Sequence, residues 1–101
     1  MFPGLTTKVS ESILTIDVLG VLSPKTDYVR IESTATSTAI ATIVPPYGGF
    51  SGALFVHNSS GGNVTTVTTG NVLTAVTIGS NALVVFIYSK TLNKYVVGAL
   101  A

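Results

Sequence analysis

The sequence predicts an all-β protein, a small antiparallel β-sandwich or jelly roll of about eight short strands. Three observations favour this class. Only 9% of the 101 residues are charged, and the abundant Thr and Val suit a pleated, half-buried strand. Short segments that alternate apolar and polar residues recur at roughly the 8–12 residue spacing of sandwich strands. No stretch of helical length carries an apolar stripe at helical spacing.

The length of the chain suits one domain. Residues 1–12 are expected to form an extended N-terminal arm, and residues 13–101 a single β-sandwich domain. The N-terminus has no basic segment followed by an apolar one, so no secretory signal is expected. The longest apolar run, Ala82 to Tyr88, is too short for a membrane-spanning helix.

Three strands are expected in the first half of the chain. Residues 12–18 are rich in β-branched and apolar side chains and are followed by a loop. Residues 28–35 alternate polar and apolar side chains, which predicts a strand with one wet face. A third strand over residues 37–44 ends at Pro45 and Pro46, which have no amide hydrogen to donate.

A glycine-rich turn after the prolines leads into the second half. Five further strands are expected there, over residues 53–58, 63–70, 71–79, 81–88 and 94–101. The two threonine-rich strands are expected at the surface. The strand over residues 81–88 is apolar on both faces, so we expect it either in the centre of the core or at a subunit contact.

The inventory of reactive side chains disfavours an enzyme. The four carboxylates fall in the first third of the chain, and there is one histidine and no cysteine. No pair of acid and base, no activated nucleophile and no metal-ligating cluster can be assembled from these residues, so no catalytic residue, metal or cofactor is expected. The net charge of +1 comes from scattered residues, so neither nucleic acid nor an anionic membrane is expected as a partner.

A few polar and aromatic residues have two interpretations. His57 lies at a predicted strand end, where turn or interface hydrogen bonding is the simpler role than catalysis. The four tyrosines could stack on carbohydrate, but packing or subunit contact explains them more simply. The glycosylation sequons at Asn58 and Asn63 are interpreted as chance in a chain this rich in Ser and Thr.

The order of segments over residues 35–97 resembles a known group of proteins. "TSTAIATIVPP" is followed by "YGGFSGALFV", "TTGNVLTAVTIG", "ALVVFIYS" and "KYVV". This order is similar to that of the small β-rich domains of tailed bacteriophages, which occur in capsid decoration (cement) proteins, head fibres and tail-fibre modules. Its marker elements fall on Pro46–Gly52, Thr69–Asn71 and Leu83–Tyr88. The last hairpin, "SKTLNKY", departs from the Asp-Gly turn and Trp that the group often has.

The resemblance implies a virion structural protein, expected to form a homotrimer. The leading hypothesis is a decoration protein, made in the host cytoplasm, that binds the outer capsid surface and clamps neighbouring subunits of the major capsid protein. The alternative is a receptor- or glycan-binding module of a head or tail fibre. The run from Ser33 to Ser89 contains no Lys, Arg, Asp or Glu. That run suits a permanently docked shell component, which needs shape complementarity rather than charge.

Three groups of residues are the candidate contact sites. The capsid-contact candidates, all apolar and all in the N-terminal arm, are Phe2, Pro3 and Leu5. The subunit-interface candidates, all on one side of the strand over residues 81–88, are Val84, Phe86 and Tyr88. The surface-recognition candidates, on turns or at strand ends, are Tyr47, Phe50 and His57.

Overall fold

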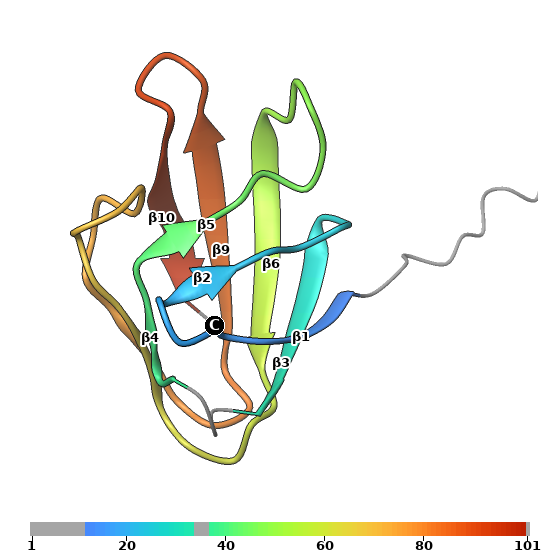
Figure 1. Cartoon of the computed structure of the whole chain (residues 1–101), viewed down its shortest axis with the longest axis vertical. Coiled ribbons are helices and arrows are strands. Elements are labelled where there is room, and N and C mark those ends of the chain that lie inside the picture. Colours follow the sequence, from blue (N-terminus) through green and yellow to red (C-terminus); the bar gives the residue numbers. More distant parts are fainter. Residues whose placement is uncertain (1–11, 34–36, 101) are drawn as a thin grey trace, which may run out of the picture.

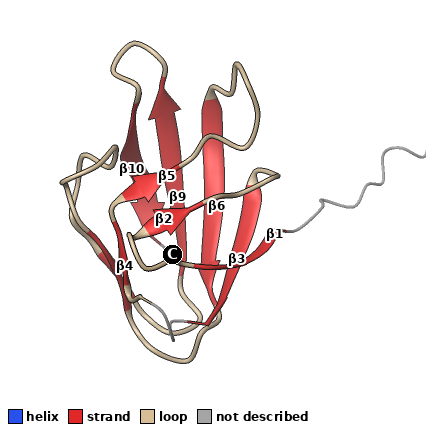
Figure 2. Cartoon of the chain, in the orientation of Figure 1, coloured by secondary structure: helices blue, strands red, loops and turns tan. Residues whose placement is uncertain are grey.

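The computed structural model describes residues 12–33 and 37–100 of the chain (Figure 1). These residues form strands and loops, and none of them lies in a helix (Figure 2). The described part therefore holds no helix long and apolar enough to cross a membrane. The strands are β1 (Ser12–Thr15), β2 (Val21–Leu22), β3 (Tyr28–Ser33), β4 (Ala39–Ile40), β5 (Thr42–Ile43), β6 (Gly52–Asn58), β7 (Val64–Thr66), β8 (Thr77–Ile78), β9 (Leu83–Ser89) and β10 (Lys94–Leu100).

The strands form two layers around one apolar core. One layer is a five-stranded sheet in the order β1-β3-β6-β9-β10. The short pair β2-β5 and the three-stranded sheet β4-β7-β8 make up the second layer, and β2 and β5 lie in front of the large sheet in Figure 1. Fully buried side chains from both layers, including Leu22, Ile43, Leu54 and Phe86, belong to one cluster. The prediction of a small all-β, sandwich-like fold is confirmed.

The strand pairing corrects the expectation of a purely antiparallel sandwich. Strand β3 pairs in parallel with both β1 and β6, and β2-β5 and β4-β7 are parallel as well. Only β6-β9, β9-β10 and β7-β8 are antiparallel among the paired strands described. After β1 the chain leaves the large sheet, forms β2 in the other layer and returns as β3. After β3 it leaves again, forms β4 and β5 in the other layer and returns as β6. Two crossings restore the original direction, whereas a hairpin reverses it.

The first crossing depends on a tight turn at Gly20. The carboxylate Oδ1 of Asp17 accepts hydrogen bonds from the backbone N–H groups of Leu19 and Val21, at 2.8 and 2.9 Å. Gly20 has φ +79°, which favours glycine. Its carbonyl accepts from the backbone N–H of Ala41 at 2.8 Å. The turn therefore sets β2 beside β5, and Asp17 has a structural role in addition to contributing charge.

The predicted strand over residues 37–44 is divided at Ala41 into β4 and β5, which belong to different sheets. The carbonyl of Ala41 accepts a hydrogen bond from the backbone N–H of Asn71 at 3.1 Å. The side chain of Asn71 then accepts from the N–H of Ile43 and donates to its carbonyl, both at 2.8 Å. This amide imitates a neighbouring strand, so the Gly70–Asn71 segment forms a clasp on β5.

The two threonine-rich strands are shorter than expected, with β7 ending at Thr66 and β8 beginning at Thr77. Strands β7 and β8 pair with each other over two positions, and side-chain hydrogen bonds hold the chain beyond the end of this ladder. The Oγ1 of the buried Thr66 donates to the carbonyl of Thr74 at 2.7 Å and accepts from the N–H of Val76 at 2.9 Å. Because this hydroxyl hydrogen-bonds to the carbonyl of Thr74 and the N–H of Val76, these backbone groups do not require a longer strand as partner.

Asn58 is a buried polar junction at the end of β6, with 0% exposure. Its Nδ2 donates to the carbonyls of Gly62, Ile78 and Gly79 at 2.7, 2.8 and 3.2 Å. Its Oδ1 accepts from the N–H and the hydroxyl of Ser60. The Asn58 side chain therefore ties the large sheet to β8, and in this fold it cannot carry a glycan without breaking those bonds.

Tyr95 is fully buried on β10, where its ring lies 4.8 Å from that of Tyr88 and 6.3 Å from that of Phe86. No other described residue hydrogen-bonds its hydroxyl. Burial, with a smaller contribution from the nearby Tyr88, raises the pKa of the Tyr95 hydroxyl well above its usual value of 10.0. Ionisation is therefore easier in the unfolded chain than in the folded one.

This environment predicts a stability that falls at high pH. The folded state holds the Tyr95 proton more tightly, so the free energy of unfolding should be constant to about pH 9 and decline as the pH rises above about 10. The Tyr95→Phe variant should lose part of this decline and be at least as stable as the wild type at neutral pH, since an unpaired buried hydroxyl is removed. Urea unfolding at several pH values measures both effects. A loss above about 1 kcal/mol at neutral pH would show that the hydroxyl has a partner.

Candidate functional site

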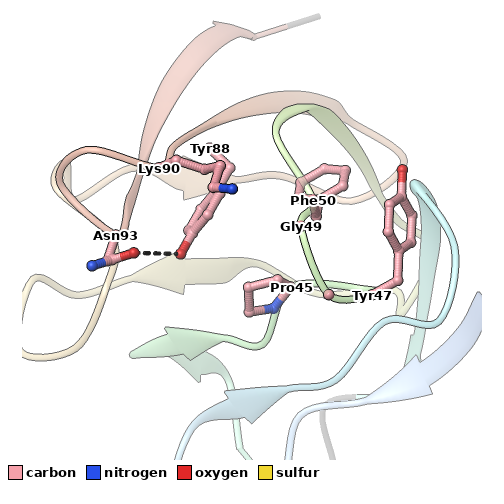
Figure 3. Close-up of a pocket in the computed structure, with 8 residues that line it drawn as sticks. Pro45, Tyr47, Gly49, Phe50, Tyr88, Lys90 and Asn93 are labelled. Carbon is pink, nitrogen blue, oxygen red and sulfur yellow. Dashed lines mark hydrogen bonds between the residues drawn. The ribbon is translucent and has the colours of Figure 1, made fainter.

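An aromatic pocket of about 230 Å³ opens at one end of the sandwich. The loop between β5 and β6 forms one side and the hairpin between β9 and β10 the other, and both lie at the same end of the molecule (Figure 1). The lining residues, shown in Figure 3, are Pro45, Tyr47, Gly48, Gly49, Phe50, Tyr88, Lys90 and Asn93.

The pocket loop has its shape from proline and glycine. Pro45 follows β5 and cannot extend its ladder. The backbone N–H of Phe50 donates to the carbonyl of Tyr47 at 3.2 Å, which closes the turn. Gly49, within the turn, has φ +80°, a conformation that residues other than glycine rarely adopt.

Packing of aromatic rings holds Tyr47 at the surface. The Tyr47 and Phe50 rings lie edge to face, with centroids 5.3 Å apart and an interplanar angle of 88°. The Phe50 ring in turn lies 6.1 Å from that of Tyr88. Phe50 is only 3% exposed, whereas Tyr47 is 55% exposed. Phe50 therefore acts as a fixed support, and Tyr47 presents an aromatic ring to solvent.

The hairpin supplies the polar side of the pocket. The Tyr88 hydroxyl donates to Oδ1 of Asn93 at 3.3 Å, drawn as a dashed line in Figure 3. Asn93 has φ 55°, a left-handed conformation that asparagine tolerates well in turns. Lys90 adds an ammonium group to the same lining. An aromatic ring, an amide and a cation can together bind a small polar ligand, but they include no nucleophile paired with a base.

The structure joins some of the predicted site residues and separates others. Tyr47, Phe50 and Tyr88 meet in the pocket. His57 lies apart from them, near the other end of β6, and is paired across strands with Arg30 and Leu83. Phe2, Pro3 and Leu5 fall outside the described residues.

Two of the subunit-interface candidates need correction. Val84 and Phe86 have 0% exposure and pack in the core of their own chain. They leave no surface for a partner, because their side of β9 faces the second layer of the same sandwich. The alternation of side chains along the sequence could not distinguish the two sides of this strand, since both are apolar. Lys90 and Asn93 were not among the predicted site residues. The signal for them in the sequence is the short polar loop that directly follows Tyr88.

The described residues contain no group of three or more His, Cys, Asp or Glu side chains that could hold a metal ion.

Comparisons with known proteins identify the fold and go no further. No protein-family model matches this chain, and no curated protein matches its sequence. Among solved structures, a chain described as "Structure of a chaperone-substrate complex" is similar, with a TM-score of 0.56 and 15% identity over 85% of this chain. This protein spans 16% of the length of that chain. At this identity the similarity shows a shared all-β fold alone.

Proposed function

We propose that the protein is a virion structural protein that decorates the outer surface of a bacteriophage capsid. In this role it binds the major capsid protein and stabilises contacts between neighbouring subunits. The segment order over residues 35–97 supports the proposal, because it resembles that of phage decoration and fibre domains. The marker elements of that resemblance adopt defined structures here, namely the pocket turn, the Gly70–Asn71 clasp and strand β9.

The observation that carries the proposal is the uncharged surface formed by residues 37–89. Between Ser37 and Ser89 the sequence has no Lys, Arg, Asp or Glu. Its exposed polar side chains are Thr, Ser and Asn, among them Thr38, Asn63, Thr68, Thr74 and Ser80. Such a surface binds through shape and hydrogen bonds, and its affinity depends little on salt or pH. Permanent docking on a shell requires those properties.

The test is co-sedimentation with capsids that lack the protein. Binding should saturate at a fixed ratio to the major capsid protein, and bound capsids should resist heat better, because the protein binds the assembled shell in preference to its parts. The affinity should change by less than about threefold between about 0.05 and 0.5 M NaCl, since few charges contribute. Absence of saturable binding would exclude the capsid role.

A second candidate function is recognition of a receptor glycan by the aromatic pocket. The specific observation is the half-exposed Tyr47 ring beside Lys90 and Asn93. Sugars stack their apolar faces on such rings and hydrogen-bond to neighbouring polar groups. The ammonium group of Lys90 favours sugars that carry a carboxylate.

Substitution of Tyr47 by alanine tests this second function on a glycan array. We expect the variant to lose glycan binding by about tenfold or more, because the stacking platform is removed. Leu92→Ala is the matched control. Leu92 is as exposed as Tyr47, at 55%, and lies on the hairpin that carries Lys90 and Asn93, but it does not line the pocket. Equal binding by the two variants would exclude the pocket, and capsid sedimentation of Tyr47→Ala would show separately whether the capsid role is affected.

A further inference from the structure

Strand β9 has a second apolar side that the described residues, 12–33 and 37–100, leave partly exposed. Val84 and Phe86 point into the core, and the side chains between and beside them point the other way. Ile87 is 38% exposed, and Leu83 and Val85 are partly exposed. A strand that is apolar on both faces is typical of a sheet covered on both sides. Among the residues that the structure describes, only one side of this sheet is covered by a second layer.

The neighbouring strands extend this apolar side into a surface. Phe55 on β6 is 40% exposed and lies opposite Val85. Ala53 on β6 lies opposite Ile87, which on its other side pairs with Val96 of β10. We call this surface the outer face, defined by Ala53, Phe55, Leu83, Val85, Ile87 and Val96. It lies on the side of the five-stranded sheet away from β2, β4 and β5 (Figure 1).

Charge is confined to the margins of the outer face. Strands β6 and β9, in the centre, contain no charged residue. Arg30 and Glu32 lie on β3 to one side, and Lys94 lies on β10 to the other. An uncharged centre with a polar rim is the usual anatomy of a protein–protein interface. The pattern favours burial of the centre in a complex.

The size of the outer face suits one further copy of the same domain. Together with its charged margins on the neighbouring strands, this side of the five-stranded sheet covers roughly 500 Å², for strands about 4.8 Å apart and up to about 23 Å long. Two such faces packed together bury on the order of 1,000 Å², which reaches the lower bound for a specific interface. Sheets of this kind pack face to face at a spacing of about 10 Å.

The relief of the face is self-complementary. The large Phe55 ring and the small Ala53 side chain lie two residues apart on the same side of β6. A two-fold axis between these two residues places Phe55 of each copy over Ala53 of the other. The large ring of each copy then packs on the small side chain of its partner, and the contact occurs twice. We propose that a second copy of this chain covers the outer face in a two-fold symmetric dimer whose large sheets pack together. This inference is independent of the capsid role, and it differs from the trimer that the resemblance implied.

Sedimentation equilibrium of the full chain tests the dimer. The wild type should show twice its mass of 10.4 kDa at high concentration and dissociate on dilution. Phe55→Asp sets a carboxylate in the centre of the face and should weaken the dimer by about 30-fold or more, the size of an interface hot spot. Leu19→Asp is the matched control, because Leu19 is 77% exposed in the turn before β2 and lies off the face. It should leave the dimer intact.

A second variant guards against misfolding. Circular dichroism establishes whether Phe55→Asp is folded, and if it is not, Ile87→Lys provides the same test from β9. A wild type that stays monomeric at all concentrations would overturn the proposal. So would an oligomer that Phe55→Asp weakens no more than Leu19→Asp does. A monomeric wild type whose capsid binding is lost in Phe55→Asp would assign the face to the capsid instead of a second copy.

Discussion

Replacing Gly70 with alanine is expected to destabilise the folded chain by at least about 3 kcal/mol. A Cβ atom at this position would overlap the backbone carbonyl of Ala41 and the hydroxyl of Thr42. The atom that it meets first is the backbone oxygen of Ala41, which cannot move aside as the end of a flexible side chain can. The clasp of Asn71 on Ile43 would have to shift with them. Thermal unfolding should show a fall of roughly 10–25 °C in Tm.

Gly48→Ala is the control for this substitution. No atom lies within 4 Å of a Cβ built on Gly48, so its Tm should change by no more than a few degrees. Any loss that the two variants share would reflect the general effect of removing a glycine rather than the contact with β5. A Gly70→Ala protein as stable as the control would contradict the close approach of residue 70 to Ala41.

Replacing Asn58 with aspartate is expected to cost about 3 kcal/mol of stability at neutral pH. The change keeps the size of the side chain but replaces a donor NH₂ group, which faces three carbonyl oxygens, with a carboxylate oxygen. The site is fully buried, so water cannot compensate for the repulsion. Chemical unfolding followed by circular dichroism measures the loss.

The pH dependence of this variant gives a sharper test. The introduced carboxyl group should be protonated more readily in the folded state, so the deficit relative to wild type should shrink as the pH falls toward about 4. Asn63→Asp is the matched control, because Asn63 begins the other sequon and is exposed. Its stability should stay within about 0.5 kcal/mol of the wild type. A similar loss in both variants would mean that Asn58 is not the buried junction described above.

Asn58 and Asn71 connect the two layers of the sandwich. Asn58 links β6 to β8 through the carbonyl of Ile78. The Asn71 side chain holds β5, while its backbone carbonyl accepts from the N–H of Tyr95 on β10 at 2.7 Å. In a chain without cysteine, polar junctions of this kind and the apolar core must hold the layers together. Such hydrogen bonds between neutral groups do not titrate, which is compatible with the proposed capsid role.

The candidate site was predictable in part. Tyr47 and Phe50 were identified because they flank a glycine-rich turn, and the structure places them together. Tyr88, predicted as a subunit-interface residue, also lines the pocket, and Lys90 and Asn93 complete it from a hairpin about forty residues further along the chain. Proximity of this kind depends on how β6 pairs with β9, which turn chemistry does not encode.

The sequence by itself determined the all-β class and the four longest strands of the large sheet. Period-two alternation and β-branched residues predict β3, β6, β9 and β10 nearly as they occur, because side-chain faces of a strand are a local property. The tertiary structure alone decided the parallel pairing of β1, β3 and β6, the division at Ala41 and the choice of which side of β9 is buried. Each of these depends on contacts between segments far apart in the chain. Such contacts are set by the crossing of the chain between layers and by side chains such as Asn71, and local patterns carry no signal for them.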